Sequence, residues 1–246
     1  MTVSIGALHI FPVKSCRGIE LQSAEVTRLG LRYDRQWMVV DAAGQFLAQR
    51  ADRGRGVAVA SMFAIDTAIE GESLRLAAPG MSPLALPLAG LAGPEVGVSI
   101  WGKTCRAIDQ GAAASDWFSA YLSRERPGRY RLVRMPDDGL RAPSRGEGAL
   151  AFADGYPFLV TSEASLADLN RRMGAPLPML RFRPNIVLTG CAAYAEDRIA
   201  RMRIGGVELI GMTRCTRCAI TTTDPVTGAR GKEPLATLAT YRREED

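Results

Sequence analysis

The sequence predicts a mainly β protein of the α+β class, with many short strands and few helices. Short apolar runs alternate with Gly, Pro, Asn and Asp turn signals through the first fifty residues. Clear helical periodicity occurs in one segment of each half, and β-branched runs recur near the carboxyl end. Strands of this length, joined by turns, are typical of barrels and sandwiches rather than of a doubly wound sheet.

The first fifty residues contain four of the expected strands. Gly30 and the pair Ala43-Gly44 supply turns between or after them. The expected strands span residues 5–12, 14–18, 21–28 and 37–41. Further along, Gly71-Glu72-Ser73 predicts a hairpin turn between the apolar residues 64–65 and 74–76.

Residues 113–122 predict an amphipathic helix. Trp117, Ala120 and Tyr121 lie on one face at helical spacing. A polar stretch that includes Pro127-Gly128 ends the pattern and favours a domain boundary nearby. We therefore expect two domains, residues 1–125 and 126–246.

The second half predicts more strands around one helix. The expected helix spans residues 164–173, with Ser165 as its N-cap and Ser162 as a slightly earlier start. Strands are expected at 158–161, 185–189, 206–211 and 220–223.

Residues 97–104 satisfy the phosphate-loop pattern of Gly, four residues, then Gly-Lys-Thr. A phosphate-binding loop follows a strand, opens a helix and keeps small residues in its interior. Here the interior carries Val98, Ile100 and Trp101, and residues 105–108 continue as strand. The match is therefore formal, and we predict no nucleotide site.

Composition places this chain among ordinary proteins with a large core. It has 246 residues, 47% of them hydrophobic, and no apolar run long enough for a membrane span. The five cysteines are an odd number and the amino terminus lacks an export signal, so we expect a reducing compartment, the cytoplasm, and no membrane contact. The net charge of +5 comes from scattered Arg residues, which favours a solvated surface over nucleic-acid binding.

The densest concentration of chemistry lies in residues 214–228. This stretch carries Cys215 and Cys218 beside two Arg residues, five Thr hydroxyls and Asp224. Nearby cations favour the thiolate, which is the nucleophile and the metal ligand. A structural zinc site would need two more ligands, but no second Cys-x-x-Cys exists and the one histidine is His9. A thioredoxin-like redox pair would open a helix, whereas a β-branched run follows here. Both alternatives stay open but are disfavoured.

Several segments offer groups that bind an anion. Lys14, one of three lysines in the chain, stands beside Ser15 in a Pro/Gly-flanked stretch. Arg35 and Arg183 add guanidinium groups that suit a phosphate, and Asn185 adds an amide donor. The Thr161-Ser162 turn adds hydroxyls and helix amino-terminal amides. Each residue alone is more often structural, and their co-occurrence with the cysteine motif indicates a basic pocket.

Taken together, these residues resemble MOSC-domain proteins that carry the associated amino-terminal β-barrel domain, the family of the amidoxime-reducing components. The resemblance covers nearly the whole chain. It rests on residues 11–18, 33–37, 99–102, 162–170, 181–185 and 215–228. It implies a MOSC β-barrel preceded by a MOSC amino-terminal β-rich domain.

The resemblance also implies a cofactor, molybdenum held by molybdopterin. It makes Cys218 the metal ligand and places Thr222 and Asp224 near the metal, with Asp224 as a proton donor by its position. The residues that the resemblance implies for pterin and phosphate binding are Lys14, Ser15, Arg35, Ser162, Arg183, Asn185 and Thr222.

The activity implied is reduction of small N-hydroxylated substrates such as amidoximes, hydroxylamines and N-hydroxylated bases. Electrons would come from a separate protein of the ferredoxin, flavin-reductase or cytochrome type. The alternative is a non-catalytic sulfur or cofactor carrier with a persulfide on Cys218. Family members continue beyond residues 241–243 with a further strand pair, so the resemblance implies that this chain lacks those last strands.

Overall fold

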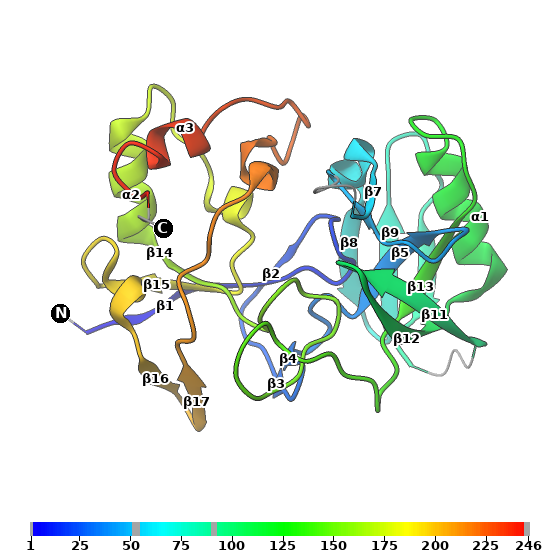
Figure 1. Cartoon of the computed structure of the whole chain (residues 1–246), viewed down its shortest axis with the longest axis horizontal. Coiled ribbons are helices and arrows are strands. Elements are labelled where there is room, and N and C mark those ends of the chain that lie inside the picture. Colours follow the sequence, from blue (N-terminus) through cyan, green and yellow to red (C-terminus); the bar gives the residue numbers. More distant parts are fainter. Residues whose placement is uncertain (1, 51–54, 90–92, 244–246) are drawn as a thin grey trace.

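A computed structural model describes residues 2–50, 55–89 and 93–243 of the chain. It forms two lobes joined by loops (Figure 1). One lobe holds α1 and most of the strands of the first half of the chain, and the other holds α2, α3 and most of the second half. The expected mainly β class is confirmed.

The first lobe is built from two antiparallel sheets and one long helix. Its four-stranded sheet runs in the order β11 (Glu95–Ile100), β12 (Lys103–Asp109), β13 (Tyr130–Arg134) and β5 (Trp37–Asp41). Its three-stranded sheet runs β10 (Leu84–Pro87), β9 (Ser73–Ala77) and β8 (Asp66–Glu70). The remaining elements are β6 (Leu47–Ala48), β7 (Val57–Ala58), the 3-10 helix η1 (Ala60–Ala64) and α1 (Gly111–Leu122).

The second lobe has a four-stranded mixed sheet with helices beside it. The order is β14 (Val160–Ser162), β15 (Ile186–Thr189), β1 (Ser4–Ile10) and β2 (Ile19–Leu21), with β14 and β15 parallel. The helical elements are α2 (Glu163–Arg172), α3 (Leu235–Leu238) and the 3-10 turns η2 (Met179–Phe182), η3 (Ala195–Arg198) and η4 (Ala219–Thr222). Two hairpins complete the structure, β3 (Val26–Thr27) with β4 (Gly30–Leu31) and β16 (Arg201–Ile204) with β17 (Val207–Ile210).

Three strands cross the expected division at residue 125. Strands β1 and β2 belong to the first half of the sequence but pair within the sheet of the second lobe. Strand β13 belongs to the second half but pairs with β5 in the first lobe. The division of the chain into domains of residues 1–125 and 126–246 therefore remains a proposal. The loops that connect the exchanged strands lie between the two lobes (Figure 1).

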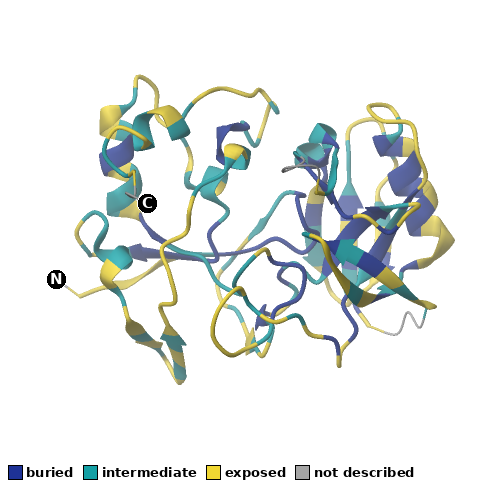
Figure 2. Cartoon of the chain, in the orientation of Figure 1, coloured by how far each residue is buried: buried dark blue, intermediate teal, exposed yellow. Residues whose placement is uncertain are grey.

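The core lies mainly in the first lobe, where Figure 2 shows most of the buried surface. Strand β5 explains why. Its side chains alternate between two clusters: Trp37 and Val39 join one, and Met38 and Val40 join the other. A strand with both faces buried needs an apolar run rather than an alternating pattern, which is what the sequence of β5 provides.

Several expected elements are confirmed. Strand β5 has the expected bounds, α1 begins two residues earlier than expected, and β8 and β9 form the expected hairpin. The formal phosphate loop is also a hairpin. Trp101 and Gly102 turn it with φ angles of 55° and 81°, as a two-residue hairpin turn requires.

Two expectations about local structure are wrong, and for the start of α2 the structure supports the earlier of the two expected positions. Residues 14–18 form a tight loop instead of a strand, because Cys16 N–H bonds Val13 C=O and Ser15 has a φ of 70°. Residues 219–222 form η4 instead of a strand, because the Thr221 and Thr222 hydroxyls donate to carbonyls three residues earlier. Helix α2 is capped by Ser162 rather than by Ser165.

Within the described residues, no helix combines the length and the apolar character needed to cross a bilayer.

Candidate functional site

Three of the predicted anion-binding residues lie close together between the lobes. Lys14 comes from the loop between β1 and β2, Arg35 from the turn before β5, and Arg183 from the residue that follows η2. Arg35 and Arg183 share the ring of Phe11, with guanidinium carbons 4.4 and 4.1 Å from its centroid. We call Lys14, Arg35 and Arg183 the basic cluster.

The backbone of this region is unusually constrained. Ser15, Arg35 and Arg183 have φ angles of 70°, 47° and 54°, in the left-handed region that residues other than glycine seldom adopt. Such conformations cost about 1 kcal/mol or more each and concentrate at binding and catalytic sites. Their presence at three residues predicted to bind a cofactor supports a functional role for this loop cluster.

Lys14 is almost completely buried. Its ammonium group donates to Phe152 C=O at 3.0 Å and forms an ion pair with Asp154. Burial lowers the pKa of Lys14, and the Asp154 charge opposes that effect. Trp101 Nε1–H donates to the same carboxylate at 2.8 Å, so Asp154 is held by two groups from distant segments.

Arg35 is fixed by neighbours on both sides. Its Nη1 donates to the buried Asp34 carboxylate at 2.7 and 2.9 Å and to Asn185 Oδ1 at 3.1 Å. Its Nη2 donates to Arg183 C=O at 3.1 Å. Arg35 therefore orients the segment carrying Arg183 and Asn185 as well as contributing charge.

Arg183 has the least charge compensation in the basic cluster. Its Nη1 donates to Cys16 C=O at 2.7 Å, and no carboxylate pairs with it among residues 2–50, 55–89 and 93–243. Burial, followed by the nearby Arg35 charge, lowers the pKa of Arg183 to about 9. A partly buried cation with no directly paired carboxylate is expected to attract an anion.

The charge balance of the whole region also favours the binding of an anion. Arg35 and Arg141 act on Lys14, and Arg35 also acts on Arg183, so four cations are linked here; two carboxylates of the described residues oppose them. The cations are Lys14, Arg35, Arg141 and Arg183, and the carboxylates are Asp34 and Asp154. An excess of two positive charges fits a phosphate group, which carries up to two negative charges at neutral pH.

Asn185 lies next to the basic cluster, whereas Ser162 does not. Asn185 accepts from Arg35 and Leu159 N–H and donates to His9 C=O. Ser162 pairs with Leu188 in the sheet, three residues beyond Asn185 and so about 10 Å farther along it. The Ser162 hydroxyl caps α2 through Ser165 N–H and also contacts Glu196. The expected joint site of Ser162 with Arg183 is not formed, because the hydroxyl serves the helix end.

Ser15 is buried beside Lys14, and its carbonyl accepts from the Gln49 side chain at 2.8 Å. Its role in the site is therefore to shape the loop through its backbone. A direct contact of its hydroxyl with a bound group stays a prediction.

The cysteine loop precedes η4. Cys218 is half-buried at the N-cap of η4, whereas Cys215 is exposed. The Cys218 carbonyl is held by Thr221 through its N–H and its hydroxyl, at 3.1 and 2.9 Å. Thr222, expected near the metal, donates its hydroxyl to Ala219 C=O at 2.8 Å and thereby stabilises the same turn.

Contacts across η2 bring the cysteine loop to the basic cluster. Arg181 Nη2 donates to Asp224 at 2.9 Å, and the Arg217 guanidinium lies 5.4 Å from the Phe182 ring centroid. Arg181 and Phe182 immediately precede Arg183, so the cysteine loop packs beside the segment that carries this partly buried cation.

A second set of contacts joins the Lys14 loop to the turn that follows the cysteines. Arg17 donates to the carbonyls of Pro225 and Val226 at 3.2 and 3.3 Å. Gly228 lies so close to Phe63 that a Cβ there would meet the ring at 2.2 Å. The turn is therefore fixed against the first lobe, and glycine is required at its end.

Asp224 holds that turn together. Its carboxylate accepts from the N–H groups of Val226 and Thr227 at 2.9 and 2.8 Å and from Arg181. The Thr227 and Val226 N–H groups, together with the Arg181 charge, lower the pKa of Asp224. A carboxylate ionised this firmly does not donate a proton at neutral pH, so the structure argues against the expected proton-donor role.

The protein side chains alone do not form a metal site of ordinary type. Among the described residues, no three or more His, Cys, Asp or Glu side chains are grouped so as to hold a metal ion. A metal bound by the Cys218 thiolate would thus take most of its ligands from a non-protein group. One thiolate beside a phosphate-sized excess of positive charge fits a metal whose organic ligand ends in a phosphate.

The sequence does not point to Asp154 as a residue of this region, and it places Trp101 only in the motif at residues 99–102, without a role in the site. Asp154 and Trp101 contact Lys14 or its counter-ion, but they lie 140 and 87 residues away from it in sequence. The one available signal was the bulky Trp101 within a glycine-flanked turn, which is unusual for a hairpin.

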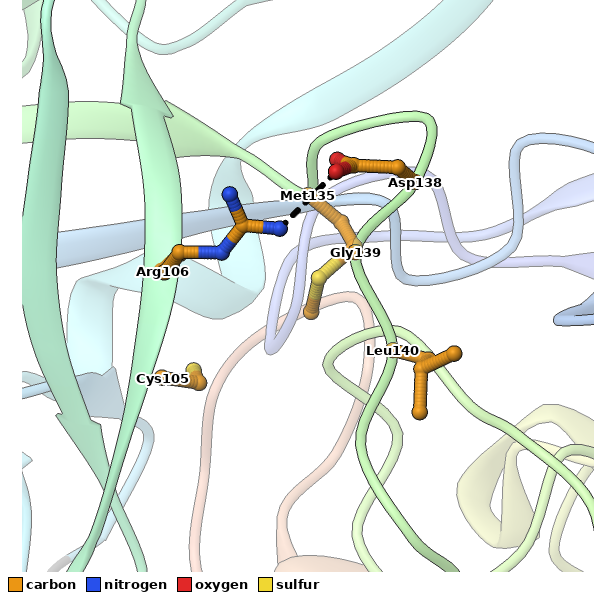
Figure 3. Close-up of a pocket in the computed structure, with 6 residues that line it drawn as sticks. All are labelled: Cys105, Arg106, Met135, Asp138, Gly139 and Leu140. Carbon is orange, nitrogen blue, oxygen red and sulfur yellow. Dashed lines mark hydrogen bonds and ion pairs between the residues drawn. The ribbon is translucent and has the colours of Figure 1, made fainter.

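A small pocket elsewhere contains none of the predicted residues. It has a volume of about 140 Å³, and Figure 3 shows the Arg106 guanidinium facing Asp138 beside Cys105. Arg106 is paired with Asp138 at 3.0 Å, and burial raises the pKa of the Cys105 thiol. Paired charges and an unreactive thiol give this pocket no evident chemistry.

Comparisons with known proteins cover both halves of the chain. Residues 2–125 match the family model of the MOSC N-terminal beta barrel domain, and residues 147–246 match that of the MOSC domain. The chain is 36% identical to mitochondrial amidoxime-reducing component 1 of Mus musculus, over 97% of this chain and 71% of that protein. It is 37% identical to mitochondrial amidoxime-reducing component 1 of Homo sapiens, over 98% of this chain and 72% of that protein.

The same comparisons correct one expectation. The relatives are named as mitochondrial proteins, which contradicts the cytoplasmic location expected from the cysteine count and the amino terminus. Those two signals report the absence of export features and do not distinguish among reducing compartments.

Proposed function

The chain belongs to the MOSC-domain family, with a MOSC N-terminal beta barrel domain preceding its MOSC domain, and from this membership we propose that it is a molybdenum-cofactor-dependent reductase of N-hydroxylated compounds. Its relatives are named amidoxime-reducing components over nearly the whole chain. The observation that carries the proposal is the Arg183 cation beside the Cys218 loop, with which no carboxylate forms an ion pair among the described residues.

The cofactor would be held at two points. Lys14 and Arg183 supply charge for its phosphate, and Arg35 positions Arg183 through the carbonyl bond at 3.1 Å. Asn185 fixes Arg35 from the other side. The Cys218 thiolate supplies the protein ligand to molybdenum, and the bound cofactor supplies the two electrons needed by the substrate.

The proposed reaction converts an amidoxime to an amidine. The N–O bond breaks, two electrons and two protons are taken up, and the oxygen leaves as water. Residues 211–216, which lead to Cys218, are exposed, so water reaches this region and supplies the protons. Asp224 serves the reaction by holding the turn beside the cysteine loop.

The electrons come from a separate protein in this proposal. A partner of the cytochrome, flavin-reductase or ferredoxin type would dock near the exposed approach to Cys218. The relatives' names do not specify the donor, and the choice among these three classes is left to reconstitution with each of them.

Metal analysis combined with an activity assay tests the proposal. Protein produced in a host that makes molybdopterin should contain molybdenum close to one per chain and reduce benzamidoxime with an artificial electron donor. Cys218→Ser should lose the reduction, and Cys215→Ser should keep part of it because its thiol is exposed and makes only a weak contact with Thr216 C=O. Cyanide-labile sulfur without molybdenum would instead identify a persulfide carrier.

A further inference from the structure

A groove lies under α2, on the same side of the sheet as Asn185. It has a volume of about 420 Å³, within the range of small-molecule sites. Its apolar floor and walls include Leu166, Met179 and Val187. Asn185 and Val187 are two residues apart on extended chain, so their side chains leave the same face of the sheet.

His9 lines this groove and is the one histidine of the chain. It is 5% exposed, and its Nδ1 atom has no hydrogen-bond partner. Burial lowers the pKa of His9, with Glu20 opposing, so the imidazole is neutral at pH 7 and can accept a hydrogen bond. Its backbone is held by Asn185 through two hydrogen bonds, at 2.9 and 3.2 Å, which fixes its position relative to the basic cluster.

Two carboxylates line the groove, those of Glu20 and Glu163. Glu20 pairs directly with His9 on the neighbouring strand, so the two side chains lie on one face. Glu163 lies against Gly6, where a Cβ would meet its Oε1 at 2.7 Å. Neither carboxylate forms an ion pair within the described part of the chain, although the protein as a whole has a net charge of +5.

These features select a ligand class. An apolar floor favours a flat hydrocarbon body, and the carboxylates favour a cation. A neutral imidazole with a free acceptor favours an N–H donor next to that cation. An arylamidinium ion has all three parts. One of its NH₂ groups can face Glu20, and the other can donate to His9 Nδ1 once the imidazole ring turns, because this atom has almost no accessible surface in the groove as it stands.

We propose that this groove is a binding site for arylamidinium ions, the products of the proposed reductase, with Glu20 and His9 holding the amidinium group. The inference rests on the proposed function for its ligand class. The amidoxime substrate is neutral at pH 7, whereas the amidine is a cation, so the groove binds product in preference to substrate.

Calorimetric titration of benzamidine tests the inference, with the neutral, equally shaped benzamide as the ligand control. Benzamidine should bind with one-to-one stoichiometry, and benzamide should not bind measurably. Glu20→Gln should weaken benzamidine binding about fivefold or more, and Glu163→Gln about twofold, because a charge-assisted bond is lost in the first case and a longer-range attraction in the second. Glu72→Gln, an exposed glutamate in the β8–β9 turn, makes the same charge change and should leave binding unchanged.

The result separates this inference from the proposed function. The groove contains none of the residues assigned to the cofactor, so the titration is run on protein with and without molybdenum. Binding that depends on Glu20 in both preparations supports the groove even if no reductase activity is found. Absence of binding at about 20 mM benzamidine, or equal binding by Glu20→Gln and Glu72→Gln, overturns it even if the protein reduces amidoximes.

Discussion

Replacement of Arg183 by methionine tests whether the basic cluster is an anion site. In the absence of anion, two effects oppose each other. The variant loses the bond to Cys16 C=O, about 1.5–3 kcal/mol, and the contact with Phe11, about 1 kcal/mol. It also removes a partly buried cation whose pKa folding lowers to about 9, and this relief is worth at most about 5 kcal/mol. Without phosphate, the free energy of unfolding should therefore fall by no more than about 4 kcal/mol and rise by no more than about 2.5 kcal/mol.

The thermal stabilities of wild type and Arg183→Met should differ when phosphate is added. If inorganic phosphate binds with a Kd of about 1 mM, then 100 mM phosphate stabilises wild type by about 2.7 kcal/mol. For a chain of this size that raises Tm by about 5–10 °C relative to sodium chloride of equal ionic strength. Arg183→Met should lose most of this rise, because the cation without a counter-ion is gone.

Thermal unfolding of wild type and of two variants measures the effect. Arg203→Met is the matched control, since Arg203 is exposed on β16 and has the same charge. It should show the full rise in Tm with phosphate. If Arg183→Met keeps the same rise as wild type, the basic cluster is not where phosphate binds and the reasoning fails.

Three further predictions concern the free energy of unfolding, measured in urea. Asp224→Asn should cost about 1 kcal/mol at pH 7. Because folding lowers the pKa of Asp224, the extra stability of wild type over Asp224→Asn is present above pH about 4 and is lost as the pH falls through the lower pKa of the folded state. A stability difference at pH 3 equal to that at pH 7 would contradict this prediction. Ser162→Ala should cost about 1–2 kcal/mol through the lost cap of α2, and no loss would mean that the cap is unimportant. Tyr194→Phe should cost about 1 kcal/mol, since its hydroxyl bonds Asp168 at 2.9 Å; a neutral change would exclude a stabilising role for that bond.

The sequence predicted elements whose cause is local. Strand β5 has an apolar run that suits a strand buried on both faces, and the hairpin of β8 and β9 has a glycine at its turn. Helix α1 has both periodicity and good helix formers. In each case a pattern within about ten residues determines the structure.

The errors arose where side chains bond their own backbone. Residues 220–223 have strand propensity, but the Thr221 and Thr222 hydroxyls satisfy carbonyls in a 3-10 turn instead. Ser165 and Ser162 both suit an N-cap, and only the structure shows that Ser162 accepts from Ser165 N–H. Propensity alone cannot rank such alternatives.

The candidate site was predictable in composition but not in geometry. Lys14 could be named because lysine is rare in this chain, and Arg35 and Arg183 because guanidinium groups suit a phosphate. Their convergence depends on strand exchange between the lobes, and the Asp154 counter-ion depends on a contact across 140 residues. No pattern within one segment carries that information.

X-ray absorption at the molybdenum edge tests the central claim most directly, because it counts sulfur atoms bound to the metal. Wild type and Cys215→Ser should show the same number of sulfur ligands, and Cys218→Ser should show one fewer. An unchanged sulfur count in Cys218→Ser, in protein that contains molybdenum, would contradict the assignment of Cys218 as the metal ligand.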